Sequence, residues 1–144
     1  MADVALLRLG PDGATLRLGP FTLTPTGLST TGRPTFDEWA HAGAVLKQIG
    51  GAVQFWLGDW LAFGEGRYGE RVAQALEASP YEEGTLRNCA YVARAIPPSR
   101  RREAVPFAIH QEVAPLPPAE QDRWLATAEA EQYSRADLRT AIRR

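Results

Sequence analysis

The feature that most constrains the fold is a change in the spacing of apolar residues near residue 33. Before it, apolar and polar residues alternate in short runs, as they do in β-strands. After it, apolar residues recur every three or four positions, the spacing of an amphipathic helix. The 144 residues suffice for one domain of about 100–200 residues. We therefore expect a mainly α protein, with a multi-helix domain at 33–144 and a small N-terminal antiparallel β-hairpin or meander at 1–32.

The N-terminal strands are expected at 5–9 and 14–18, on either side of the turn sequence Gly-Pro-Asp-Gly at 10–13. The alternating run at 21–24 can add a third strand. An isolated hairpin is only marginally stable in water, so this segment must pack on the helices or on another copy. Two interpretations stay open: a small cap over the helical core, which we favour, and a dimerisation or specificity appendage.

The residues from Thr35 onward predict a series of short helices. Thr35 and Glu38 form a capping-box sequence at the start of the first helix, and Gly50-Gly51 is expected to end it. The next helix carries a stripe of apolar residues expected in the core, namely Val53, Trp56, Leu57, Trp60 and Leu61. Further helices are expected at about 69–78, 83–95, 98–103, 107–113, 118–130 and 135–143, the last with a capping box at Ser134 and Asp137.

Two features of this region have patterns that also occur in ligand sites. Three tryptophans within 22 residues can mark a binding cage, but their helical spacing favours core packing. The run Gly64 to Gly69 matches the G-x-G-x-x-G pattern of dinucleotide-binding proteins. That pattern requires a preceding strand, and Glu65 would repel a pyrophosphate. We therefore expect a helix end followed by a turn.

Composition narrows the class of protein further. Sixteen basic and seventeen acidic residues exclude a wholly basic nucleic-acid coat protein and a long acidic tail. A single cysteine cannot form an internal disulfide, and no signal peptide or long apolar run is recognisable. The sequence thus favours a cytoplasmic protein that does not span a membrane.

Catalytic and metal-binding patterns are weak. With two histidines and one cysteine, a structural zinc site is not expected. A small enzyme centred on Asp59 and His110 is a remote alternative, because no second carboxylate or nucleophile is paired with Asp59. We expect no catalytic residues, no metal and no cofactor.

Residues 68–102 are the most informative about function. A helix at 68–78, a turn at 79–82 and a helix at 83–95 follow the order of a helix-turn-helix. The second helix has an apolar arc centred on Leu86 and an opposite polar arc. Arg and Asn suit guanine and adenine edges, and Tyr and Thr can reach phosphates. Arg87, Asn88 and Tyr91 would approach base edges. The polar residues expected at DNA are Thr85, Arg87, Asn88, Tyr91 and Arg94.

An arginine cluster follows this helix. Ser99, Arg100, Arg101 and Arg102 are expected at the surface, where the arginines would grip phosphates, and His110 could add a backbone contact. Residues 85–111 hold five arginines and one acid, a local charge of +4. The alternative is a solvated helix face followed by a polar loop.

The same part of the chain resembles the LmbU-like family of bacterial transcriptional regulators. The resemblance covers about 35–144 and is carried by motifs at 56–61, 68–71, 85–88, 92–94, 99–102, 110–114, 120–125 and 138–139. More distantly, 68–144 is similar in layout to the helix-turn-helix domain of KorB/ParB partition and repressor proteins. The turn between 73 and 85 is about three residues longer than in ParB-type units, and the ParB arginine patch and nucleotide-binding domain are not found, so CTP hydrolysis is not implied.

The resemblance and the residues together predict a sequence-specific double-stranded DNA-binding protein that regulates transcription, associated with the nucleoid. A single helix-turn-helix reads only a few base pairs, so we expect a homodimer on a palindromic site. The alternative is a phage- or plasmid-type protein–protein adaptor, or a partition accessory protein, with no base-specific readout. The affinity of a DNA-binding protein falls steeply as salt rises, whereas an adaptor would show no such salt dependence for DNA. A salt titration therefore distinguishes the two hypotheses.

Overall fold

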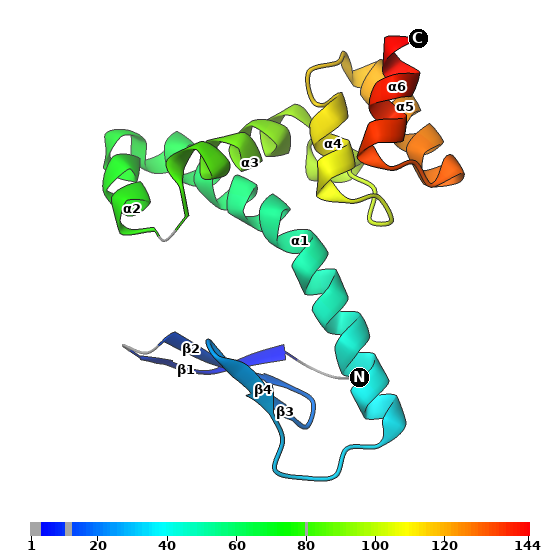
Figure 1. Cartoon of the computed structure of the whole chain (residues 1–144). Coiled ribbons are helices and arrows are strands. Elements are labelled where there is room, and N and C mark those ends of the chain that lie inside the picture. The colour runs from blue at the N-terminus through cyan, green and yellow to red at the C-terminus, as the bar shows by residue number, and fades with distance from the viewer. Residues whose placement is uncertain (1–3, 11–12, 80) are drawn as a thin grey trace. The chain divides into compact units, whose positions relative to one another are not determined.

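The computed structural model describes residues 4–10, 13–79 and 81–144 (Figure 1). It divides into two compact units, one reaching to Gly50 and the other comprising Gly51–Arg144. The boundary lies within the long helix α1 (Phe36–Tyr68), which contributes to both. Within the described residues, no helix is both long and apolar enough to cross a membrane.

The N-terminal unit contains a four-stranded antiparallel meander. Its strands are β1 (Val4–Gly10), β2 (Gly13–Leu18), β3 (Phe21–Thr24) and β4 (Gly27–Ser29), in the order β1-β2-β3-β4. The antiparallel pairing of the first two strands and the third strand are confirmed, and β4 is an addition to them. Pro11 and Asp12 of the predicted turn lie outside the described residues. Leu18 and Phe21 are buried against Ala42 of α1, so the sheet does pack on a helix.

Helix α1 begins where the sequence predicts and continues past the predicted break. The Thr35 N–H donates to Glu38 Oε1 (2.9 Å) and the Glu38 N–H donates to Thr35 Oγ1 (3.1 Å), which confirms the capping box. The expected end at Gly50-Gly51 is wrong. Each glycine costs about 1 kcal/mol relative to alanine, but helix propagation is cooperative and no proline intervenes. The helix ends before Gly69, whose φ of 58° is the left-handed value common after helices.

After α1, the described residues of the C-terminal unit form only helices and the loops that connect them. Its elements are η1 (Gly69–Arg71), α2 (Val72–Ala78), α3 (Glu83–Ala95), η2 (Pro98–Arg100), α4 (Phe107–Val113), α5 (Pro118–Glu131) and α6 (Arg135–Arg143). The capping box at Ser134 and Asp137 is present. The prediction of a mainly α fold with a small antiparallel sheet is therefore confirmed.

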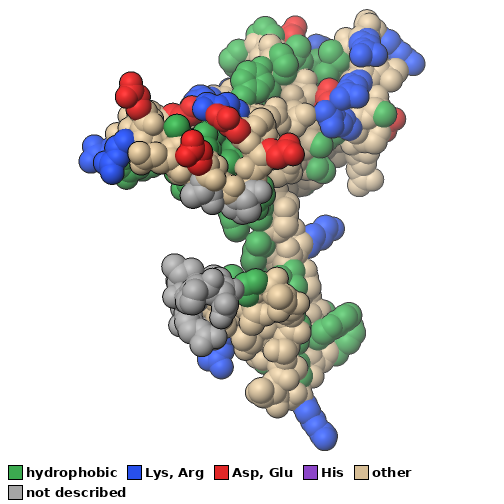
Figure 2. Space-filling view, turned by 60° about the vertical axis from the view of Figure 1, so that its left-hand side comes forward, with side chains coloured by type: hydrophobic (Ala, Val, Ile, Leu, Met, Phe, Trp, Pro, Cys, Tyr) green, Lys and Arg blue, Asp and Glu red, His purple; other side chains and the backbone are tan. Residues whose placement is uncertain are grey.

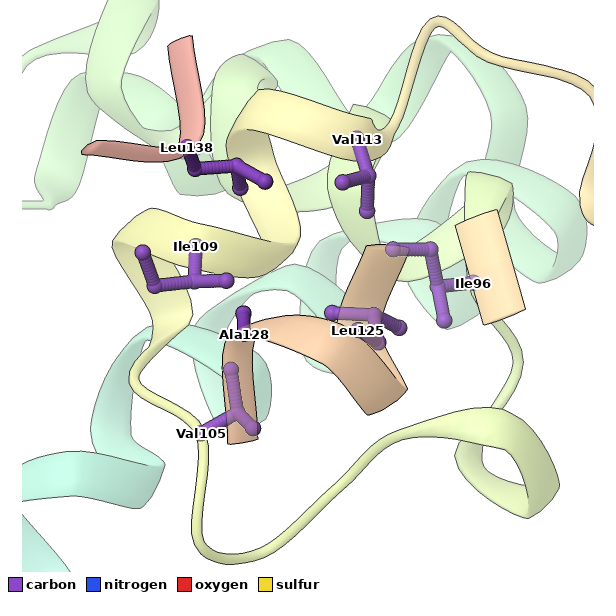
Figure 3. Close-up of a cluster of buried hydrophobic side chains, with 7 residues drawn as sticks. All are labelled: Ile96, Val105, Ile109, Val113, Leu125, Ala128 and Leu138. Carbon is purple, nitrogen blue, oxygen red and sulfur yellow. The ribbon is translucent and has the colours of Figure 1, made fainter. Parts of the chain in front are cut away.

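Helix α3 lies at the centre of this unit. Its residues Leu86 and Ala90 pack on α1 and α2, while Cys89 and Val92 pack on Phe107 of α4. Ile96, directly after α3, joins a third cluster with side chains of α4, α5 and α6 (Figure 3). Three buried clusters therefore hold the apolar face of α3, and the opposite face remains at the surface.

The two tryptophans of the apolar stripe on α1 do not lie in the core. Trp56 and Trp60 are 55% and 50% exposed, whereas Leu61 is buried. The expectation of core packing is wrong for these two tryptophans, because α3 approaches α1 along another side. It is also wrong for Trp39 in the N-terminal unit, which is 61% exposed. At Gly58, an added Cβ would collide with the backbone carbonyl of Cys89. This close approach covers the side of α1 that carries Gly58 and Leu61.

Candidate nucleic-acid interface

The polar arc of α3 forms one exposed face. Thr85, Arg87, Asn88, Tyr91 and Arg94 are all exposed, while the residues of the apolar arc are buried. The helix is amphipathic with a 3.6-residue repeat, so covering one arc leaves the other open. The structure therefore brings together on α3 the five residues that the sequence singles out there.

Glu65 of α1 lies between the two arginines of this face. Its Oε2 is 3.1 Å from Arg87 Nη1, and its Oε1 pairs with Arg94. Arg87 also pairs with Glu83 one turn earlier (2.9 Å). Both acids raise the pKa of the Arg87 guanidinium, Glu83 more than Glu65. Both arginine side chains remain half-exposed. Sequence reasoning missed this role of Glu65, because its partners lie 22 and 29 residues away.

Asn88 lies at the other edge of the face, towards α4. Its Nδ2 donates to Gln111 Oε1 at 2.9 Å. A side-chain amide has a second N–H and a carbonyl oxygen, so this bond occupies only part of its hydrogen-bonding capacity. Tyr91, between Asn88 and the arginines in angular position, is 47% exposed.

Arg101 is a structural side chain. Only 12% of it is exposed, so its expected place at the surface is wrong. It makes a bidentate pair with Asp59 of α1 (2.8 and 2.9 Å) and donates to the carbonyls of Ile96 (2.7 Å) and Ala93 (2.9 Å). The guanidinium also lies 4.8 Å from the centre of the Phe55 ring. Arg101 therefore joins the end of α3 to α1.

The other residues of this cluster are more accessible. Arg100 bonds Gln121 Oε1 (2.9 Å) and Asp122 Oδ1 (3.0 Å) of α5 and is one-quarter exposed. Arg102 pairs with Glu129 at 2.6 Å, and both side chains are over one-third exposed. Ser99 is exposed on η2.

The local charge of +4 is thus balanced from elsewhere in the fold. The five arginines of 85–111 all contact acids, which are Glu65, Glu83, Asp122, Asp59 and Glu129. In Figure 2 acidic and basic side chains accordingly lie next to one another in the upper part of the view. Any DNA contact of these arginines must compete with an existing ion pair.

His110 is completely buried. Its Nε2 accepts the Arg102 N–H (3.1 Å), and its Nδ1 lies 3.0 Å from the Pro106 carbonyl, which assigns the proton to Nδ1. Burial lowers the pKa of His110, and the nearby Arg101 charge lowers it further against the opposing effect of the Pro106 bond. His110 therefore braces the loop before α4 as a neutral side chain. The described residues contain no group of three His, Cys, Asp or Glu side chains placed to hold a metal.

Comparison with known proteins adds one relative. The chain is 41% identical over 109 residues to the transcriptional regulator NovE of Streptomyces niveus. This chain is similar to a bacterial transcriptional regulator. The match covers 76% of this chain but spans only half the length of NovE. No protein-family profile and no solved structure matches the chain.

Proposed function

We propose that this chain is a sequence-specific double-stranded DNA-binding protein that regulates transcription, in the manner of LmbU-like regulators. In this proposal α2, the turn after it and α3 act as a helix-turn-helix, and α3 enters the major groove. The observation that carries the proposal is the exposed face of α3, which presents arginine, asparagine and tyrosine. The opposite face of the same helix is buried in the core. The similarity to NovE supports it.

Arg87 and Asn88 are the proposed base readers. Both lie in the N-terminal half of α3, the part of a recognition helix that usually meets base edges. Arg suits guanine O6 and N7, and Asn suits adenine N6 and N7. The ion pair with Glu65 does not prevent Arg87 from contacting a base, because exposed ion pairs contribute only about 0–1 kcal/mol to stability.

The proposed phosphate contacts flank these two residues. These contacts are Thr85, Arg94, Ser99, Arg100 and Arg102, which all retain some exposure. Tyr91, between Asn88 and the arginines, would approach a base edge as well. We leave Arg101 and His110 out of the DNA surface, since both are engaged inside the fold. The protein would act in the cytoplasm at the nucleoid, as a homodimer on an inverted repeat, and without enzymatic activity.

Selection of binding sites from random duplexes tests the proposal. It should yield a preferred sequence, with an affinity that falls steeply as salt rises. A protein–protein adaptor would show neither property, and that result would overturn the proposal.

Arg87→Ala and Asn88→Ala then test the base readers on the selected site and on random DNA. Each should cost about 1–3 kcal/mol on the selected site and much less on random DNA. Arg123→Ala is the matched control, because this arginine lies on α5 against Trp124. Equal losses on both DNAs would refute base reading while leaving DNA binding intact.

A further inference from the structure

Three of the exposed aromatic side chains of the helical unit line a cavity of about 510 Å³ between the end of α1 and α2. Trp60, Phe63 and Tyr68 of α1 line it and are 50–65% exposed. Leu61 and Val72 lie deeper and are buried. Phe63 and Tyr68 meet edge to face, with ring centroids 6.3 Å apart. The cavity therefore has an apolar interior and an aromatic rim.

The polar lining comes mainly from Arg71 of η1 and Gln74 of α2. Among the described residues, no carboxylate lies within ion-pairing distance of Arg71. This contrasts with the arginines of α3 and of the cluster after it, which all have acidic partners. A guanidinium beside an aromatic cavity is suited to a carboxylate or similar anion.

The size of the surface favours a small molecule over a second copy of the chain. An aromatic side chain covers about 150–250 Å², so three that are half to two-thirds exposed offer roughly 300–400 Å². One side of a stable dimer interface needs about 800 Å². The cavity volume, in contrast, lies within the range of about 300–1,000 Å³ that is usual for small-molecule sites.

We propose that this cavity binds a planar aromatic anion, whose ring lies against Trp60, Phe63 and Tyr68 and whose anionic group pairs with Arg71. Ring faces and edges attract one another, and Gln74 can donate a hydrogen bond to the anion. This site goes beyond the proposed DNA binding and does not require it. In addition, α2 forms one wall of the cavity, so a bound ligand would act on the first helix of the proposed helix-turn-helix.

The test uses 2-naphthoate as the probe and 2-naphthamide as its uncharged analogue, with the full chain and no DNA. Titration followed by ¹⁵N NMR should show saturable shifts at Trp60, Gly64 and Val72, with a dissociation constant in the micromolar to millimolar range expected of so small a ligand. The indole signal of Trp124, on α5, should not move. Naphthamide should bind about tenfold more weakly, because it lacks the charge-assisted bond.

Matched variants locate the site. Arg71→Ala should weaken naphthoate about tenfold and naphthamide less than twofold, whereas Arg67→Ala should change neither. Trp60→Ala should weaken both probes, whereas Trp56→Ala, equally exposed but outside the cavity, should leave both unchanged. Circular dichroism checks that each variant is folded.

Three results would overturn the proposal. They are shifts scattered over the whole unit, equal losses in the two tryptophan variants, and light scattering that shows a dimer broken by Trp60→Ala and not by Trp56→Ala. The action on α2 rests on the proposed function and has its own readout. Saturating naphthoate should change the affinity for the selected DNA, and an unchanged affinity despite binding would refute that action alone.

Discussion

Replacing Arg101 with alanine should destabilise the helical unit far more than replacing its neighbour Arg102. The two side chains adjoin in the sequence, but they differ in what they hold. Arg101 is nearly buried and bonds Asp59 and two backbone carbonyls at the end of α3. Arg102 makes one exposed pair with Glu129.

The expected magnitude follows from these contacts. Hydrogen bonds to a charged group contribute about 1.5–3 kcal/mol each, and a buried pair that loses one partner costs about 3–5 kcal/mol. Asp59 is nearly half exposed and can be hydrated again, which reduces the loss. The Ala93 and Ile96 carbonyls lose their donor at a helix end. Taking these contributions together, we expect Arg101→Ala to lower the free energy of unfolding by about 2–4 kcal/mol.

Urea unfolding of the two variants and the parent protein measures this directly. Arg102→Ala should cost about 0–1 kcal/mol, because its ion pair is exposed. In a thermal scan the loss in Arg101→Ala corresponds to a fall in Tm of roughly 10–25 °C for a domain of this size. Similar midpoints for both variants would refute the structural role of Arg101.

The salt dependence of the proposed DNA binding tests the same two variants in a second way. Arg102→Ala should flatten the log–log salt slope by up to about 0.9, the value for one lost phosphate contact. Arg101→Ala, measured at a temperature where it is folded, should leave the slope unchanged. A flatter slope in Arg101→Ala would show that this side chain reaches DNA.

Three further perturbations have clear expected outcomes. Glu65→Gln removes the acid shared by two arginines of α3, so it should raise DNA affinity up to about fivefold, as expected for an exposed pair, and steepen the salt slope. Gly58→Ala should cost about 1–3 kcal/mol or more in urea unfolding, because its Cβ would collide with the Cys89 carbonyl. Burial lowers the pKa of His110, so the unfolded chain binds a proton more readily; stability should be constant above the ordinary pKa of about 6.5 and decrease as pH falls below it.

Matched controls make each outcome decisive. Glu70→Gln makes the same charge change on η1, and an equal gain in affinity there would contradict the role of Glu65. Gly66→Ala lies in the same helix with open space around it, so it should gain about 0.5–1 kcal/mol. His110→Gln should flatten the decrease in stability between pH 6.5 and 5.5. Glu112 does not interfere there, because Arg139 and Arg135 lower the pKa of its carboxyl from an already acidic value.

The order and type of most elements follow from the amino-acid sequence alone. Alternation before residue 33 and a helical repeat after it depend on backbone geometry alone, so they can be read locally. The two capping boxes join residues three positions apart, and both are present. The two arcs of α3 are equally local, because the helical repeat places them opposite each other in any fold.

Helix α1 shows where this local reasoning ends. Its second half carries apolar residues on more than one side, so periodicity leaves open which side a neighbour covers. The approach of α3 at Gly58 decided this, burying Leu61 and leaving Trp56 and Trp60 exposed. Trp60, left exposed in this way, lines the aromatic cavity.

The arginines show the same division between sequence and tertiary structure. The sequence determined how many lie near α3, but apart from Glu83, four residues before Arg87, their acidic partners lie 22 to 42 residues away. Ion pairs and burial depend on which distant segments the packing brings within a few ångströms, since a charged side chain loses its hydration only where another element covers it. Tertiary structure alone therefore separated Arg101 and His110, which are engaged inside the fold, from the arginines whose side chains stay partly exposed in their ion pairs.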